Sequence, residues 1–127
     1  MRIIRAMYKR KIKQERLTPF DHVMVILGNK WNSRLLSIFH KKGVLRYNEI
    51  RKALPGISDP VLSNALRILQ AEKIVSRKQY EEVPLRVEYG LTDRGQELVD
   101  LCKQICAWGF KYYPGVPEEE RPFGDPE

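Results

Sequence analysis

The sequence predicts one mainly α-helical domain with a small β-hairpin. With 127 residues the chain can bury a single core, but it has no room for a second domain with its own cofactor fold. Hydrophobic residues make up 43% and charged residues 31%, a balance typical of a folded soluble protein rather than of a disordered chain. Apolar residues recur at helical spacing through most of the chain, and at strand spacing in a segment after its middle.

Two helices are expected in the first third of the chain. Apolar residues at helical spacing predict a short helix over 19–27, which Gly28 can end because glycine tolerates a left-handed backbone. Asn29 can accept hydrogen bonds from the first N–H groups of a second helix that begins near Lys30. Gly43 is expected to close that helix.

A short extended piece and a short helix follow. Val44 to Arg46 is expected to be extended, and Asn48 is placed as the N-cap of a two-turn helix. The Pro55-Gly56 pair ends that helix, because proline and glycine together favour a turn.

The next helix is expected at about 58–71. Ser58 caps it, and Asp59 and Pro60 suit its first turn, where the helix dipole is positive and the N–H that proline lacks would have no partner. On a helical wheel the residues separate into two sides. The apolar side contains Leu62, Ala65, Leu66 and Leu69, and the side expected to face solvent contains Pro60, Ser63, Asn64, Arg67 and Ala71.

Two strands and a long helix follow. Residues 74–80 and 85–91 have strand-like composition and predict an antiparallel hairpin over 74–91. Thr92 is the expected N-cap of a final helix that ends near Gly109. The apolar stripe of this helix consists of Leu98, Leu101, Cys102, Ile105 and Trp108.

This order of elements is that of a winged helix-turn-helix domain. In such a domain the recognition helix after the turn, here about 58–71, enters the DNA major groove, and the wing at about 74–91 lies over the phosphates. For each candidate the alternative is an ordinary solvated side chain, and for Ser58 it is a helix cap alone. The residues expected to contact DNA are Arg46, Asn48, Ser58, Pro60, Ser63, Asn64, Arg67, Arg77, Lys78 and Arg86.

Five separated motifs lie in order between Pro19 and Gly109. They are Leu27-Gly28-Asn29-Lys30-Trp31, Arg46-Tyr47-Asn48-Glu49-Ile50-Arg51, Leu54-Pro55-Gly56-Ile57-Ser58, Val83-Pro84-Leu85-Arg86-Val87-Glu88-Tyr89-Gly90-Leu91-Thr92 and Ala107-Trp108-Gly109. Together they resemble the HxlR-type regulators. The resemblance implies a prokaryotic DNA-binding transcription factor that works as a homodimer through its first and last helices. The residues implied at the dimer contact are Phe20, Val23, Leu98, Leu101, Cys102, Ile105 and Trp108.

Two positions depart from the family pattern. Many members that sense oxidants carry a cysteine directly before a proline, whereas this chain has Thr18 before Pro19, so sensing through that thiol is excluded. The recognition helix opens with Asp59-Pro60-Val61 instead of polar or basic residues. Asp59 is expected to cap its own helix, and the alternative is that it accepts a hydrogen bond from a cytosine amino group.

Charge divides the chain into three parts. Residues 1–16 contain seven basic side chains and one acid, and are expected to form a basic N-terminal arm. Residues 114–127 contain five acids, one arginine and four prolines, and are expected to be a disordered acidic tail. The winged helix-turn-helix domain is assigned to residues 17–113. The formal net charge of +7 favours a polyanionic partner.

The two cysteines, Cys102 and Cys106, are four residues apart on the final helix. The simpler interpretation is that both are small buried apolar residues, and the alternative is that thiols of two subunits meet across a two-fold axis. His22 and His40 have no evident partners for metal binding or catalysis. We therefore expect no enzymatic activity, no metal and no cofactor.

The preferred function is that of a dimeric, sequence-specific transcriptional regulator of a roughly palindromic double-stranded DNA operator. The alternative is a nonspecific architectural nucleoid protein that uses the same fold as a basic surface. No apolar run approaches the roughly 20 residues of a membrane-spanning helix, and residues 1–16 lack a secretory signal. The expected location is therefore the cytoplasm, at the nucleoid, with no membrane partner.

Overall fold

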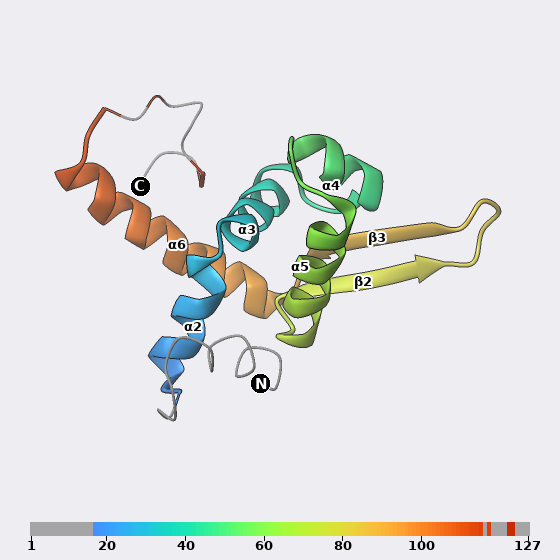
Figure 1. The fold of residues 1–127 in the computed structure, drawn as a ribbon, viewed down its shortest axis with the longest axis horizontal. Coiled ribbons are helices and arrows are strands. Elements are labelled where there is room, and N and C mark those ends of the chain that lie inside the picture. Colours follow the sequence, from blue (N-terminus) through green and yellow to red (C-terminus); the bar gives the residue numbers. More distant parts are fainter. Residues whose placement is uncertain (1–16, 116, 118–121, 124–127) are drawn as a thin grey trace.

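Helices form most of the computed structural model, and short strands form one small three-stranded sheet (Figure 1). The structure describes residues 17–115, 117, 122 and 123. No helix within this described part is both long enough and apolar enough to cross a membrane. The elements are α2 (Pro19–Gly28), α3 (Lys30–Lys42), β1 (Leu45–Arg46), α4 (Tyr47–Ala53), α5 (Asp59–Ala71), β2 (Val75–Tyr80), β3 (Arg86–Leu91) and α6 (Asp93–Tyr112).

The first two helices have well-formed caps. The hydroxyl of Thr18 accepts a hydrogen bond from the N–H of Asp21, and the Asp21 carboxylate accepts one from the N–H of Thr18. Asn29 caps α3 as predicted, because its side-chain oxygen accepts hydrogen bonds from two N–H groups of the first turn. Gly43 follows the last turn of α3 with a φ of 77°, which confirms the predicted stop.

The expected N-cap at Asn48 is wrong. The helix α4 begins at Tyr47, so Asn48 lies inside its first turn, and the N-cap position belongs to Arg46. The N–H of Arg46 donates to the Glu49 carboxylate at 2.9 Å. A glutamate at this position can satisfy that N–H, so the helix starts one residue before the side chain that looked like its cap.

The predicted hairpin is present, and a third strand joins it. Strands β2 and β3 are antiparallel, with Val75 opposite Leu91 and Tyr80 opposite Arg86. The predicted extended piece forms β1 and pairs with β3, so that β3 is the central strand. This pairing attaches the segment before α4 to the base of the wing.

The final helix is longer than expected. It begins after Thr92, whose hydroxyl accepts a hydrogen bond from the N–H of Gly95 at 3.0 Å, which confirms the predicted cap. It continues to Tyr112, past the predicted end at Gly109. Gly109 does not take the positive φ that would end the helix. A glycine inside a helix lowers its stability by only about 1 kcal/mol relative to alanine, so the helix continues through Gly109.

The core lies between α3, α5, α6 and the base of the sheet. Its fully buried side chains include Leu35, Leu36, Ile50, Leu62, Leu66, Leu69 and Val99. The fold is thus a mainly α-helical winged helix domain, as predicted, with the sheet at one end of a helical body (Figure 1).

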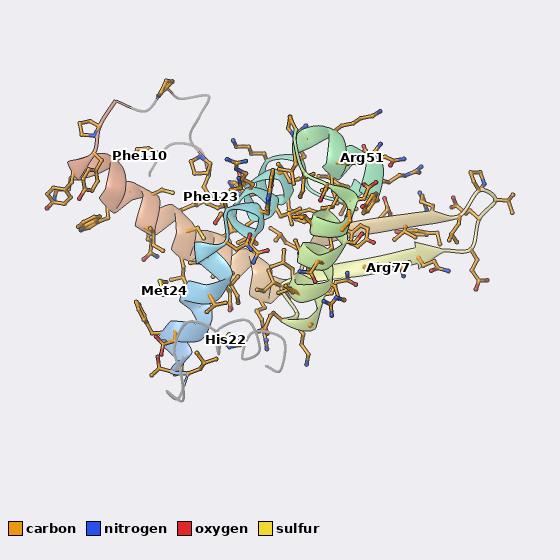
Figure 2. All side chains as sticks on the ribbon, in the orientation of Figure 1. His22, Met24, Arg51, Arg77, Phe110 and Phe123 are labelled. Atoms are coloured by element: carbon orange, nitrogen blue, oxygen red, sulfur yellow. The ribbon has the colours of Figure 1, made fainter. Side chains whose placement is uncertain are left out.

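Part of the acidic segment 114–127 packs on this body. Phe123 is buried, and its ring lies 6.2 Å from the His40 ring between centroids (Figure 2). The hydroxyl of Ser37 donates a hydrogen bond to the carbonyl of Pro122. The expected arm at 1–16 and all of the charged residues of the tail lie outside the described residues.

Candidate nucleic-acid interface

The helix α5 presents one polar face to solvent. Ser63, Asn64 and Arg67 are exposed, whereas Leu62 and Leu66 are fully buried, which confirms the two predicted sides. Ser58 caps the helix as expected, because its hydroxyl accepts a hydrogen bond from the N–H of Val61 at 3.3 Å. In Figure 1, α5 stands beside α4, and the hairpin projects from the domain next to it.

Two of the predicted base-reading residues contact each other. Nη2 of Arg67 donates a hydrogen bond to Oδ1 of Asn64 at 2.6 Å, one helical turn away. Both side chains retain further N–H donors, since guanidinium has five and an amide has two. Such donors match the N7 and O6 acceptors that guanine presents in the major groove.

The negative charge of Asp59 is satisfied within the protein. The hydroxyl of Tyr47 donates to Oδ1 of Asp59 at 3.2 Å, and Nη1 of Arg51 lies 3.5 Å from the same oxygen. The Tyr47 hydroxyl also lies 3.3 Å from the hydroxyl of Ser63. Asp59 therefore connects α4 to the start of α5, and Arg51 offsets the repulsion that its carboxylate would exert on a phosphate.

Tyr47 and Arg51 are functional candidates that sequence reasoning missed. Both belong to α4, and they meet α5 only because the turn folds the two helices against each other. Their presence in the motif Arg46-Tyr47-Asn48-Glu49-Ile50-Arg51 was the available signal.

Arg46 and Asn48, expected at the DNA, are both exposed at the start of α4. Arg46 also belongs to β1 and lies opposite Glu88 of β3. The sheet therefore holds the start of α4 at a defined place relative to the wing.

The three basic side chains of the wing that were expected to contact phosphates lie in two kinds of environment. Arg77 and Lys78 are exposed on β2 (Figure 2 labels Arg77). Arg86 is only partly exposed, and its guanidinium lies 3.7 Å from the centroid of the Tyr80 ring and 3.1 Å from the carboxylate of Glu82. Arg86 thus packs across the hairpin. Arg77 and Lys78 are exposed and make looser contacts within β2: Arg77 donates to the Gln79 amide oxygen at 3.3 Å, and Nζ of Lys78 lies 4.9 Å from the centroid of the Tyr80 ring.

A second, apolar surface lies on the two helices implied at the dimer contact. We call it the α2/α6 apolar surface, and it includes exposed Phe20, Met24, Leu101, Ile105, Trp108, Tyr112 and Tyr113. The rings of Trp108 and Tyr112 are 5.0 Å apart between centroids. In Figure 1, α2 and the C-terminal part of α6 lie away from the hairpin, whereas the first turns of α6 lie at its base. Of the other implied contact residues, Leu98 and Cys102 lie in the chain's own core, and Val23 packs against that core while only partly buried.

The two thiols are set among apolar neighbours. Burial raises the pKa of Cys102 to about 11, with a further contribution from nearby Cys106, whose own pKa is also raised by burial. Both thiols are free. Within the described part of the chain, no three His, Cys, Asp or Glu side chains come together as a metal site.

Comparison with known proteins relates this geometry to a family. Residues 26–116 match the model of the HxlR-like helix-turn-helix family. An HTH-type transcriptional regulator from Halalkalibacterium halodurans is 34% identical over 106 residues, which cover 84% of this chain and 94% of the relative. The HTH-type transcriptional regulator YdzF of Bacillus subtilis is 36% identical over 92 residues, covering 72% of this chain and 84% of YdzF.

A solved structure shows the same arrangement of elements. A protein described as a MarR-family transcriptional regulator from Enterococcus faecalis superposes with a TM-score of 0.71 at 31% identity. The superposition covers 80% of this chain and 91% of that protein.

Proposed function

We propose that this chain, which belongs to the HxlR-like helix-turn-helix family, is a sequence-specific transcriptional regulator that binds double-stranded DNA as a homodimer. The observation that carries the proposal is the exposed polar face of α5, with Ser63, Asn64 and Arg67 in one patch beside the hairpin. A helix with such a face fits the major groove, and its amide and guanidinium groups match base edges rather than phosphates alone.

The wing and α4 supply affinity in this proposal. Arg77 and Lys78 contact phosphates beside the groove that α5 enters, and Arg46 and Asn48 contact the phosphates at the start of α4. Ser58 and Pro60 lie at the N-terminal end of α5, which faces the same backbone. These contacts position the recognition helix but do not select the sequence.

A second copy of the chain covers the α2/α6 apolar surface. Phe20, Leu101, Ile105 and Trp108 then enter the interface, while Leu98 and Cys102 support it from the core. The dimer places two recognition helices in successive major grooves, about one helical turn apart, on a nearly palindromic operator at the nucleoid. The basic segment 1–16 adds nonspecific affinity for DNA.

A selection followed by a competition titration tests the proposal. Bound duplexes are selected from a random pool with the purified protein, and the selected site then competes with random duplex at physiological salt. A regulator prefers its site by roughly 10³-fold or more. A preference below about tenfold favours the architectural nucleoid protein instead, which recognises the backbone and charge of any duplex.

A further inference from the structure

The C-terminal end of the recognition helix contacts other helices through Glu72. This residue is the C-cap of α5, and its N–H donates to the carbonyl of Ile68 at 3.0 Å. Its side chain is buried, with only 9% exposed, although glutamate is among the residues least often buried. A buried carboxylate needs a partner of matching chemistry, because leaving it without one is costly.

That partner comes from α2, fifty residues earlier in the chain. Nε2 of His22 lies 2.7 Å from Oε2 of Glu72, and only 14% of the His22 side chain is exposed. This distance is that of a hydrogen bond between the ring nitrogen and the carboxylate oxygen. A short hydrogen bond between a ring and a carboxylate fixes both direction and distance.

His22 lies on the inner side of a helix with two different sides. Ile26, one turn later, is buried in the core, whereas Phe20 and Met24 are exposed on the α2/α6 apolar surface (Figure 2 labels His22 and Met24). The helix that presents Phe20 and Met24 to a second copy therefore contacts the end of the recognition helix with its opposite side.

The other helix of the apolar surface, α6, also contacts the chain at the end of α5. Nη1 of Arg94 on α6 donates to the carbonyl of Glu72 at 3.2 Å. The hydroxyl of Thr92, the N-cap of α6, donates to the carbonyl of Lys73 at 2.5 Å, and its N–H donates to the carbonyl of Ile74 at 3.0 Å. The segment 72–74, which we call the α5 joint, thus connects the recognition helix to both α2 and α6.

We propose that His22 and Glu72 are positioning residues that set the angle between the recognition helix and the dimer helices, and thereby the half-site spacing that the dimer accepts. The inference rests on the proposed function, because only a dimeric reader of two half-sites has a spacing to control. Neither residue contacts DNA in this arrangement. Both act through the orientation of α5.

The size of the expected effect follows from the length of the helix. With 13 residues, α5 is about 20 Å long at 1.5 Å per residue. A rotation of about 10° at the joint therefore moves the far end of α5 by about 3 Å, close to the 3.4 Å rise of one base pair. The reading residues Ser63, Asn64 and Arg67 lie five to nine residues from the joint, so the same rotation moves them by about 1–2 Å, a large part of one base-pair step.

The experiment measures affinity for a set of operators that differ only in half-site spacing. The operator selected above is lengthened and shortened by one and two base pairs, and each duplex is titrated with wild type, His22→Ala, His22→Gln and Glu72→Gln. Wild type is expected to lose about tenfold or more for each base pair away from the best spacing, because protein or DNA must deform to fit. In His22→Ala the loss falls to within about threefold, since a looser joint tolerates several spacings. In Glu72→Gln the loss falls by a smaller factor, because the amide oxygen still accepts a hydrogen bond but carries no charge.

Conservative and control variants separate positioning from general damage. His22→Gln keeps an N–H donor and is expected to recover part of the wild-type spacing profile. A double-mutant cycle of His22→Ala and Glu72→Gln measures the share of the effect that passes through the contact between His22 and Glu72. Glu97→Gln removes a carboxylate from an exposed position of α6 and should leave the profile unchanged. All variants are compared as dimers, by sedimentation, below their melting temperatures.

The outcomes distinguish this inference from the proposed function. If wild type selects no operator, both fail. If wild type discriminates spacing and His22→Ala and Glu72→Gln discriminate it equally, only the positioning role fails. If Glu97→Gln flattens the spacing profile as much as the variants at His22 and Glu72 do, the positioning role is also overturned. The change in the profile would then not come from the α5 joint.

Discussion

The two exposed regions of this molecule differ in the chemistry that they offer. The region of α4, α5 and the wing exposes polar and cationic side chains such as Asn64, Arg67 and Arg77. The α2/α6 apolar surface exposes Phe20 at 70%, Ile105 at 53% and Trp108 at 61%. Water solvates the first region well and the second poorly. The difference fits the proposed function, in which the first region binds DNA and the second packs on a second copy of the chain.

The apolar surface is comparable in size to the largest apolar patch of a typical monomer, which is often a functional site. Its seven side chains expose together on the order of several hundred Å² of apolar area, given that each aromatic ring alone has roughly 150–250 Å². A standard protein interface buries about 800 Å² on each partner, so this surface can supply most of one. The α5 joint connects both regions, so the orientation of α2 and α6 in the dimer can set the orientation of the recognition helix α5.

The largest expected effect comes from placing a charge in the apolar surface. Ile105→Glu should prevent dimerisation, because a carboxylate buried without a partner is costly. Losing the second half-site should weaken specific binding by about 10²- to 10⁴-fold. Sedimentation velocity and titration of the operator measure the two losses.

Gln96→Glu is the matched control for that variant. It adds the same charge to an exposed residue of α6 on the side opposite Ile105. A dimeric Ile105→Glu protein with full affinity would show that the partner lies elsewhere.

The second expected effect concerns the packing of the α5 joint. A Cβ added at Gly95 would lie 2.1 Å from the carbonyl oxygen of Ile74, where no real Cβ fits. Gly95→Ala should therefore lower the free energy of unfolding by about 3 kcal/mol. Chemical denaturation measures this loss.

Gly28→Ala provides the comparison, because a Cβ at Gly28 meets nothing within 4 Å. Its effect should stay within about 1 kcal/mol. Equal stability of the two variants would mean that α6 does not approach the joint as closely as described.

The third expected effect tests base reading by the polar region. Arg67→Ala should cost about 1–3 kcal/mol on the selected operator if Arg67 reads a guanine, and much less on random duplex. Fluorescence anisotropy with both duplexes measures the difference. Equal losses on both would reassign Arg67 to phosphate binding.

A smaller effect is expected from the wing. Arg77→Ala should weaken binding to operator and random duplex alike, and should reduce the slope of log K against log salt by about 0.9. Binding isotherms at several salt concentrations give that slope. Ser76→Ala removes an uncharged hydroxyl of β2, which donates to the carbonyl of Gly90, and it should leave the slope unchanged. If Arg77→Ala lost affinity for the operator but not for random duplex, Arg77 would be reassigned from phosphate contact to base contact.

The smallest expected effect concerns the thiols. Because the pKa of Cys102 is raised to about 11, its thiol stays protonated below that pH and its thiolate becomes abundant only as the pH rises toward 11. Mild oxidation at pH 7–8 should therefore give no covalent dimer on nonreducing electrophoresis. A covalent dimer that disappears in Cys102→Ser would restore the alternative of a disulfide across the two-fold axis.

Local features of the structure could be predicted from the sequence. The caps at Asn29, Ser58 and Thr92 and the stop at Gly43 involve atoms within four residues of one another. The two sides of α5 follow from its helical period alone. Asn48 failed as a predicted cap, because Glu49 satisfied the N–H of the residue before the helix. Gly28 and Gly109 failed as predicted stops, because both lie inside their helices without a positive φ, and the C-cap of α2 is Asn29 instead.

The division of the α6 stripe required the packed structure. Leu98 and Cys102 lie on one edge of that stripe and face the core, whereas Leu101, Ile105 and Trp108 lie on the other edge and are exposed. The sequence shows only that all five are apolar. Which edge is covered depends on where α3 and the other helices sit, and that is decided by residues far away in the chain.

The sequence by itself determined where most of the helices begin, which faces are polar, and to which family the chain belongs, because caps, periodicity and motifs are local patterns. The tertiary structure alone decided that β1 joins the sheet, that Arg86 stacks on Tyr80, and that His22 meets Glu72. These contacts join elements whose approach depends on the burial of the whole core, so no local pattern specifies them.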